Sequence, residues 1–247
     1  MAKWLNGTVV DNYRWNDRLT SLKFDAPLEG FKAGQFVRVG LEIDGDIVAR
    51  PYSLVNSPGE SPLEIYFNIV PEGPLTPPLF QLRKGDDLLV APNTAGFLTV
   101  SEIPDARDLW MMATGTAIGP FLSMLNEDEA WQRFERIILC YSVRSKNELA
   151  YADSIVQIAG KHEAQFCFIP LITREQVSDA LPMRIPAAIE NGSLEKRAGV
   201  DINPEHSHIM MCGSGDMIRE VSALLESRDL RKHRRREPGH FSTEKYH

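Results

Sequence analysis

The Arg-Pro-Tyr-Ser run at residues 50–53 combines three side chains that suit a large aromatic cofactor carrying phosphate. The guanidinium of Arg50 presents a rigid fork of donors that matches a pyrophosphate. The phenol ring of Tyr52 can lie flat against another aromatic system, and the small Ser53 hydroxyl can approach a reacting atom without crowding it. Four residues recur by chance, so this run gains its weight from two later segments, 113–120 and 211–217. In this order the three indicate a flavin site followed by a nicotinamide site.

The segment Ala-Thr-Gly-Thr-Ala-Ile-Gly-Pro at 113–120 lies where an apolar run gives way to a helical pattern. Gly115 lets the backbone approach a diphosphate closely. A helix over residues 120–125 offers free N–H groups and a positive dipole end, and Pro120 suits its first turn. The segment is not G-x-G-x-x-G, so the ordinary dinucleotide fingerprint is absent and a plain strand-to-helix turn is the alternative.

Three arginines indicate which nicotinamide nucleotide is bound. Arg144 and Arg174 lie just beyond the ends of separate apolar runs, and Arg184 lies in the loop after the second. Arginine forks match the phosphate monoester that distinguishes NADP from NAD. No acidic residue ends the 140–144 run, where a carboxylate would hold a free ribose 2′-hydroxyl. Taken singly, each arginine could equally be a solvated surface side chain.

The first hundred residues predict the strands of a small antiparallel barrel. Apolar and polar residues alternate over 19–24 and 36–41, and further strands are expected at 63–70 and 88–91. Asp44-Gly45 is a strong hairpin turn. Short strands separated by Gly and Pro turns, with little helical period, are typical of such a barrel.

The second part of the chain predicts a parallel sheet with helices on both faces, because apolar runs alternate there with helical segments. The runs are 108–113, 136–141, 166–169 and 208–212, and helices are expected at 120–125, 149–159 and 216–226. Ligands bind at the carboxyl ends of such strands, so Thr114, Arg144, Thr173 and the 212–215 segment should converge at one edge. The boundary near 99–105 gives two domains, 1–100 and 101–247.

Composition places the chain among ordinary globular proteins, with 43% hydrophobic and 25% charged residues over 247 positions. Three cysteines without paired spacing, no signal peptide and no membrane-length apolar run predict a cytoplasmic protein, and nothing demands an assembly, so a monomer is expected. A sequence pI of about 5.4 argues against nucleic-acid binding. The six histidines show no metal-binding spacing.

Positive charge gathers at the end of the chain. Residues 228–247 carry seven Lys and Arg against three Asp and Glu, whereas the whole chain has a net charge of −7. A basic segment on an acidic body can dock an acidic partner. The alternative is a solvated basic helix end, which charge alone favours.

From end to end the sequence resembles the ferredoxin–NADP reductase family, most of all its bacterial ferredoxin/flavodoxin–NADP reductases. The matching motifs are Arg50-Pro51-Tyr52-Ser53, Val70-Pro-Glu-Gly-Pro-Leu-Thr76, the 113–120 segment, Tyr141-Ser-Val-Arg144, Thr173-Arg174 and Met211-Cys-Gly213. The resemblance implies an N-terminal antiparallel β-barrel that binds FAD and a C-terminal α/β domain that binds NADP(H).

The resemblance also implies roles for individual residues. FAD contacts fall on Arg50, Pro51, Tyr52, Ser53, Tyr66, Pro74, Leu75, Thr76, Thr116, and the terminal pair Tyr246 and His247, either of which could take the place of the family's terminal aromatic ring. NADP contacts fall on Val143, Arg144, Thr173, Arg174, Arg184, Gly213 and Ser214. The residues implied at the reacting centre are Ser53 near the flavin N5, Tyr52 against the flavin ring and Cys212 beside the nicotinamide. In Cys212 the alternative is a buried small hydrophobe at a strand end.

The activity implied is hydride transfer from NADPH to the flavin N5, followed by single-electron transfer to ferredoxin or flavodoxin. Two other functions remain open on the sequence. One is an NAD(P)H-dependent reductase that takes free flavin as a substrate. The other is a non-catalytic flavin-binding electron-transfer subunit, although such subunits often add a cysteine cluster for iron–sulfur that this chain lacks.

Overall fold

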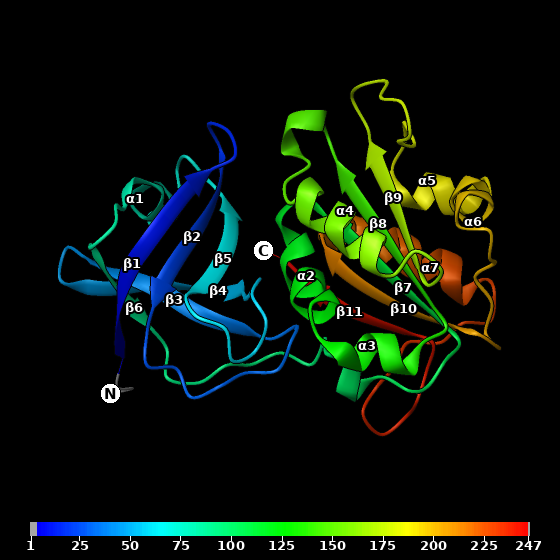
Figure 1. The fold of residues 1–247 in the computed structure, drawn as a ribbon, viewed down its shortest axis with the longest axis horizontal. Helices are drawn as coiled ribbons and strands as arrows, with labels where there is room; N and C mark the ends of the chain where they lie inside the picture. Colours follow the sequence, from blue (N-terminus) through cyan, green and yellow to red (C-terminus); the bar gives the residue numbers. More distant parts are fainter. Residues whose placement is uncertain (1–3, 247) are drawn as a thin grey trace.

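A computed structural model describes residues 4–246 of the chain. The protein contains two β-sheets that lie side by side (Figure 1). The first is an antiparallel six-stranded sheet with strand order β4-β3-β6-β1-β2-β5. The second is a parallel five-stranded sheet with strand order β11-β10-β7-β8-β9. The predicted fold, an antiparallel barrel followed by an α/β parallel sheet, is therefore confirmed.

The strands of the first sheet are curved into a barrel-like body. Their bounds are β1 (Leu5–Arg14), β2 (Leu19–Asp25), β3 (Phe36–Ile43), β4 (Asp46–Ser53), β5 (Leu63–Asn68) and β6 (Asp87–Val90), and the short helix α1 (Thr76–Gln81) lies between β5 and β6. Alternate residues face inward and form a core that includes Leu22, Phe24, Val37, Val39 and Ile65. Strand β1 was not predicted, because its sequence LNGTVVDNYR has few apolar residues, yet it pairs with both β2 and β6.

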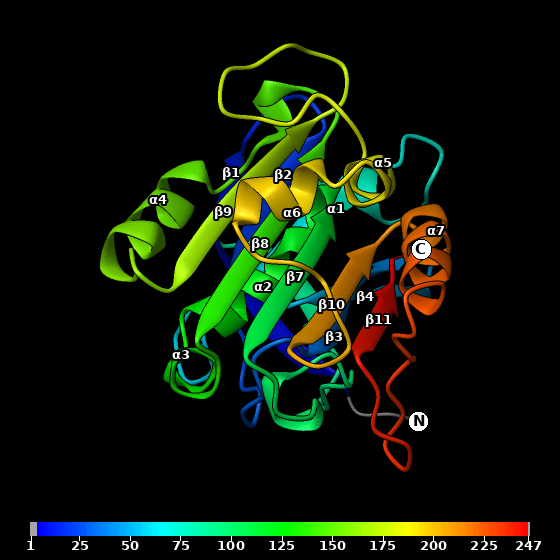
Figure 2. The ribbon, with the colours of Figure 1, turned by 90° about the vertical axis from the view of Figure 1, so that its right-hand side faces the viewer.

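The parallel strands are buried from both sides, so most read as continuous apolar runs. They are β7 (Asp108–Thr114), β8 (Arg136–Val143), β9 (Phe166–Ile172), β10 (Ser207–Gly213) and β11 (Phe241–Lys245). One face is covered by α2 (Gly119–Leu125), α3 (Asp128–Arg133) and α4 (Ala152–Lys161), and the other by α5 (Ile185–Glu190), α6 (Ser193–Ala198) and α7 (Gly215–Glu226) (Figure 2). The described part of the chain also contains three short 3₁₀ helices: η1 (Val100–Glu102), η2 (Gly115–Ile118) and η3 (Lys146–Glu148).

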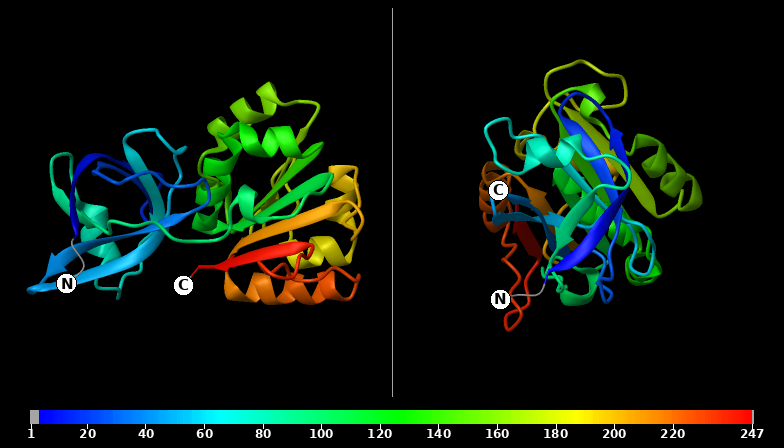
Figure 3. Two further views of the ribbon diagram at one scale, coloured as in Figure 1. Left: turned by 90° about the horizontal axis from the view of Figure 1, so that it is seen from below. Right: turned by 90° about the vertical axis from the view of Figure 1, so that its left-hand side faces the viewer.

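The basic end of the chain contains a strand that its charge concealed. β11 pairs in parallel with β10 and brings the C-terminal residues to a position between the two sheets (Figure 3). The loop before β11 lies at the opposite, amino edge of the sheet, where Arg235 pairs with Glu102 at 3.1 Å and Arg234 with Glu237 at 3.7 Å. The segment is thus neither a free tail nor a helix end, and part of its charge is neutralised locally.

The two sheets share an apolar core. Leu19, Val55 and Tyr66 of the barrel are buried in one cluster with side chains of the parallel-sheet side, including Phe121 of α2 and Ile155 of α4. A hydrogen bond of 2.7 Å from Ser123 Oγ to the Asn56 carbonyl crosses the same boundary. No helix within residues 4–246 has the length and apolar character to cross a membrane.

Candidate active site

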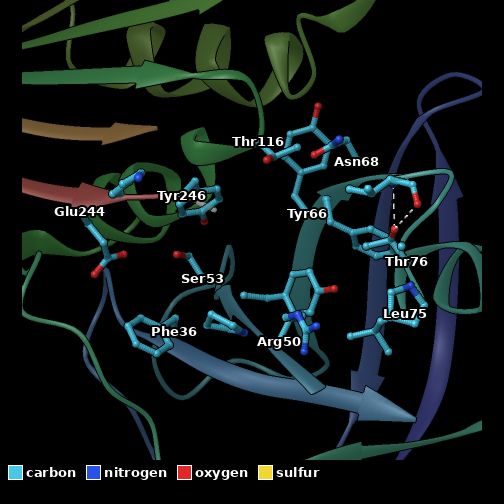
Figure 4. Close-up of a pocket in the computed structure, with 17 residues that line it drawn as sticks. Phe36, Arg50, Ser53, Tyr66, Asn68, Leu75, Thr76, Thr116, Glu244 and Tyr246 are labelled. Carbon is cyan, nitrogen blue, oxygen red and sulfur yellow. Dashed lines mark hydrogen bonds between the residues drawn. The ribbon is translucent and has the colours of Figure 1, made fainter. Parts of the chain in front are cut away.

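The first cavity lies at the barrel edge that faces the parallel sheet (Figure 4). Its volume is ≈ 430 Å³. It is lined by every predicted FAD residue that the structure describes: Arg50, Pro51, Tyr52, Ser53, Tyr66, Pro74, Leu75, Thr76, Thr116 and Tyr246. The predicted contact of His247 lies outside the described residues. The antiparallel pairing of β4 with β3 sets Tyr52 opposite Val37 and Ser53 opposite Phe36. This pairing fixes both residues at the C-terminal end of β4.

Three residues that line this cavity carry a buried hydroxyl that has no hydrogen-bond partner within residues 4–246. These hydroxyls are Tyr52 Oη, Ser53 Oγ and Tyr66 Oη. Buried polar groups are nearly always paired, so unpaired hydroxyls on residues that line one cavity are consistent with a polar ligand there. Burial raises the pKa of Tyr52 and of Tyr66 well above the usual value for a phenol, so both stay protonated and can donate.

The other end of the cavity suits an anion. The exposed guanidinium of Arg50 is bonded to one backbone carbonyl, that of Ala49 at 2.9 Å, which leaves most of its donors available. The Thr76 hydroxyl accepts a 2.8 Å bond from the Val70 N–H and so shapes the 70–76 loop. The cavity therefore offers an aromatic wall, unpaired donors and a cation, which is the donor set that a flavin nucleotide requires.

A second cavity of ≈ 980 Å³ lies at the carboxyl edge of the parallel sheet, as the sequence predicted. Among the predicted NADP residues, its lining includes Val143, Arg144, Thr173, Arg184, Gly213 and Ser214. Arg174 directly follows Thr173 but is exposed and outside the lining. Its N–H donates to the Arg144 carbonyl at 2.8 Å, which places its backbone beside that of Arg144.

A close approach of two strand ends forms the floor of this second cavity. Gly213 has φ +144°, and a Cβ there would collide with the Thr114 hydroxyl, so only glycine fits. The Ser214 N–H donates to Thr114 Oγ1 at 3.0 Å, and the Ser214 hydroxyl accepts from the Met217 N–H at 3.2 Å as the N-cap of α7. The side chains at 114 and 214 are therefore held in place before any ligand binds.

The turn after β7 contains the 3₁₀ helix η2. The helix that follows, α2, begins at Gly119, one residue before the expected start at Pro120, and Gly119 packs against Val55 of the barrel. The helix N-terminus is consequently buried in the domain boundary. Gly115, at φ +55°, and Thr116 line the cavity instead, so the backbone of η2 is what a ligand there would meet.

Acidic side chains hold the Arg184 side chain and the Arg144 backbone in place. Arg184 Nη2 lies 2.7 Å from Glu220 Oε2, and the Arg144 N–H donates to Glu148 Oε2 at 3.0 Å. The side chains of Arg144 and Arg184 are exposed, so a phosphate can reach both.

The two cavities meet. Asn68, Thr116 and Tyr246 line both of them. Tyr246 comes from the chain end just after β11, and its N–H donates to the Gly213 carbonyl at 2.9 Å, which holds it at the junction. Burial raises the pKa of its phenol well above the usual value. An aromatic ring in the first cavity and one in the second would therefore approach each other around Tyr246.

Cys212 is placed differently from the other predicted residues at the reacting centre. Its side chain is fully buried, it lines neither cavity, and burial raises the pKa of its thiol well above the usual value. Contact with a nicotinamide would require its neighbours to move, so that role stays a prediction. The alternative of a buried small hydrophobe describes its position in this structure.

Several residues that line the two cavities were not predicted from the sequence. Glu244 lies in the first cavity, and burial raises its pKa to about 7. Its position was hidden because β11 was taken as part of a charged tail. Phe36 and Asn68 line the same cavity, and the turn at 16–19 lines the second. Phe36 follows from pairing with Ser53, but the 16–19 turn becomes part of a site only through the packing of the two sheets.

The fold and the paired cavities define a two-domain oxidoreductase that brings two redox nucleotides together. A family model described as an oxidoreductase NAD-binding domain matches residues 111–223. The chain is 43% identical over 247 residues, with full coverage of both chains, to a flavodoxin/ferredoxin–NADP reductase of Shigella flexneri, and 42% identical with the same coverage to that of Escherichia coli. It superposes with a TM-score of 0.94 on a ferredoxin NADP⁺ reductase from Neisseria gonorrhoeae with bound FAD and NADP, at 31% identity and 99% coverage of each chain. The chain belongs to the flavodoxin/ferredoxin–NADP reductase family.

Proposed function

We propose that the protein is an FAD-dependent reductase that passes electrons between NADPH and ferredoxin or flavodoxin. The observation that carries the proposal is the junction of the two cavities at Asn68, Thr116 and Tyr246. Bound FAD supplies a centre that accepts a hydride and releases electrons singly. The protein's part is to bind the two nucleotides, to orient their rings and to exclude water between them.

The barrel residues fit FAD at its pyrophosphate and at its flavin ring. Arg50 binds the pyrophosphate, with the backbone of Pro74, Leu75 and Thr76 opposite it. Tyr52 and Tyr66 present their rings to the flavin, and Ser53 offers its unpaired hydroxyl to the flavin N5. The buried hydroxyls then gain the partners that the protein alone does not give them, which makes FAD part of the folded structure.

The sheet residues fit NADPH. Arg144 and Arg184, which line the cavity, bind the 2′-phosphate together with the adjacent Arg174, while η2 and the Gly213–Ser214 turn receive the pyrophosphate and nicotinamide end. A bound flavin would supply a hydride acceptor that needs no separate proton transfer from the protein, so no residue of the site is assigned as a general base. Residues 1–100 then act as the FAD domain and residues 101–247 as the NADP domain.

The electron acceptor we propose is ferredoxin or flavodoxin, and we propose that the protein works as a monomer in the cytoplasm. Support for the acceptor comes from the names of the full-length relatives. The three cysteines are unpaired in the structure, as expected for a reducing compartment.

Purification followed by a nucleotide titration tests the proposal against its rivals. The expected result is a yellow protein that keeps FAD through gel filtration and reduces flavodoxin with NADPH. A colourless protein that takes up flavin only transiently would support the free-flavin reductase instead. A yellow protein that NADPH does not bleach would support the non-catalytic subunit.

A further inference from the structure

Tyr151 adopts a backbone conformation that an aromatic residue rarely takes. Its φ and ψ are 60° and 18°, in the left-handed region, at the residue that precedes α4. A bulky side chain is strained there, because its Cβ crowds the following carbonyl. Such strain persists only where the surroundings hold the residue in place, and it marks positions with a role.

The surroundings that hold Tyr151 belong to the other sheet. Its hydroxyl donates to Glu64 Oε1 at 2.6 Å and lies 2.5 Å from Ser21 Oγ. Its ring centroid is 4.8 Å from that of Trp15 and 5.3 Å from that of Tyr66, the latter edge-on. We call Trp15, Ser21, Glu64, Tyr66 and Tyr151 the interdomain cluster.

Strand pairing explains why these barrel residues face Tyr151. β2 and β5 are antiparallel, with Ser21 opposite Tyr66 and Lys23 opposite Glu64. The residues between them, Leu22 and Ile65, point into the barrel core, so the alternation sends the others toward the parallel sheet. Because Tyr66 also lines the first cavity, the interdomain cluster touches the flavin site directly.

At its other end Tyr151 closes the loop that follows β8. Arg144, Asn147 and Glu148 of this loop line the second cavity. The Asn16 side chain donates to the Asn147 carbonyl at 3.1 Å, which gives the loop a second bond to the barrel. One short segment is thus joined to the barrel twice while it carries one of the proposed phosphate-binding arginines.

We propose that Tyr151 is a positioning residue for hydride transfer, which holds the nucleotide-binding loop against Tyr66 so that the two bound rings meet in register. The inference rests on the proposed function. The phenol is suited to this role because it is 9% exposed and its acceptor is a carboxylate, which makes a charge-assisted bond. Burial and the adjacent Glu64 raise the pKa of Tyr151 well above the usual value, so it remains a donor.

The role has kinetic consequences because hydride transfer is sensitive to small displacements. A misplacement of about 1 Å can slow a positioned reaction by roughly a hundredfold. The bond between Tyr151 and Glu64 joins the two sheets, whereas the proposed phosphate-binding arginines all lie on the parallel-sheet side, so their arrangement relative to one another does not depend on this bond. Its loss should therefore slow transfer at saturating NADPH and leave the affinity for the adenosine end unchanged.

Tyr151→Phe tests the proposal, because it keeps the ring and removes only the hydroxyl. The matched control is Tyr13→Phe, since Tyr13 packs on the same Trp15 at 4.8 Å, is 54% exposed, and its hydroxyl has no hydrogen-bond partner among the described residues. Three quantities are measured on the FAD-loaded proteins: the rate of flavin bleaching at saturating NADPH, the affinity for 2′,5′-ADP, and the change that NADP⁺ causes in the visible flavin spectrum.

For Tyr151→Phe we expect bleaching to slow about tenfold or more and the spectral change to shrink, with the 2′,5′-ADP affinity within about twofold of wild type. Tyr13→Phe should match wild type in all three. Unchanged bleaching, or a parallel loss of bleaching and 2′,5′-ADP affinity, would overturn the proposal. A wild-type protein that NADPH does not bleach would overturn the proposed function as well.

A second variant keeps the test valid if Tyr151→Phe does not fold. Glu64→Gln leaves an oxygen to accept from Tyr151 but removes the charge of the acceptor. Here a smaller loss of bleaching rate is expected, about threefold or more, again without loss of 2′,5′-ADP affinity. Wild-type bleaching in a folded Glu64→Gln protein would contradict the proposal.

Discussion

The two cavities differ in size, in burial and in the side chains that they offer to a ligand. The barrel cavity is small and places buried, unpaired hydroxyls against aromatic rings. The sheet cavity is more than twice as large and carries exposed arginines on loops after separate strands. Desolvated polar groups that lack partners favour a ligand that stays, whereas solvated cations favour one that exchanges. We therefore infer that the barrel retains its nucleotide, whereas the parallel-sheet side selects and releases its own.

The largest effect is expected when the positively charged side chains of the sheet cavity are removed. In Arg144→Ala combined with Arg184→Ala, the affinity for NADPH should fall by about a hundredfold or more, since each charge-assisted bond contributes about 1.5–3 kcal/mol. The affinity for NADH should change little, because NADH has no 2′-phosphate. Titration of both nucleotides measures the difference.

The control for this pair is Arg219→Ala, an exposed arginine of α7 that bonds to Asp216 and lines neither cavity. It should leave both affinities unchanged. Equal losses for NADPH and NADH in the double variant would refute the 2′-phosphate assignment. Arg174→Ala alone should cost less than Arg144→Ala, since Arg174 lies outside the lining.

The barrel cavity should impose a pH dependence on stability through Glu244. Its pKa in the folded protein is about 7, raised by burial from 4.5. Between these values the folded state keeps a proton that the unfolded state has released, so stability falls as pH rises from about 4.5 to 7. The full loss is about 2–3 kcal/mol after allowance for partial exposure.

Thermal unfolding of the FAD-free protein at pH 5 and pH 8 measures this loss. Glu244→Gln should flatten the difference, while Glu226→Gln, an exposed carboxylate of α7, should keep it. A Glu244→Gln protein with the same pH profile as wild type would show that another group titrates.

A smaller effect is expected from Tyr52→Phe in the barrel cavity, where one substitution should change protein stability and FAD binding in opposite directions. Tyr52→Phe removes a buried hydroxyl that has no hydrogen-bond partner among residues 4–246, so the FAD-free protein should become more stable by about 1 kcal/mol. The same change should weaken FAD binding by about fivefold or more, because the bound ligand loses a donor. Chemical unfolding and FAD titration measure the two effects, and a loss of stability without FAD would contradict the assignment.

The smallest effect is expected at the basic loop before β11. It lies at the amino edge of the parallel sheet, about 15 Å along β11 from the cavities. Changing Arg234, Arg235 and Arg236 to Glu should therefore alter flavodoxin reduction by less than about threefold at physiological salt. A loss larger than tenfold, with NADPH bleaching intact, would restore this loop as the docking surface.

The sequence predicted best where a local pattern is sufficient. The apolar runs of β7, β8 and β10 and the helix α7 follow from periodicity, and the residues just after those strands line the cavity as expected. It failed where packing decides. β11 reads as a charged tail because its strand character depends on β10 beside it.

Contacts between the two sheets could not be predicted from the sequence, because they too depend on packing. Nothing in the local pattern of Tyr151 indicates a left-handed backbone or a bond to Glu64, which is 87 positions away. The buried start of α2 is a second example, because the tight fit at Gly119 arises from Val55 of the barrel, which lies 64 positions away in the sequence. Sequence motifs pointed to the residues that line the two cavities. The contacts that set the position of one domain against the other involve residues such as Tyr151 and Val55, which belong to none of these motifs.

The most direct test of the account is rapid mixing of the FAD-loaded protein with NADPH deuterated at the transferring position of nicotinamide C4, followed by flavin absorbance. If the rings meet at the junction of the cavities, bleaching will be fast, will slow with the deuterated nucleotide, and will be far slower with NADH at the same concentration. Bleaching that shows no isotope effect under single-turnover conditions, or equal rates with NADH and NADPH, would contradict it.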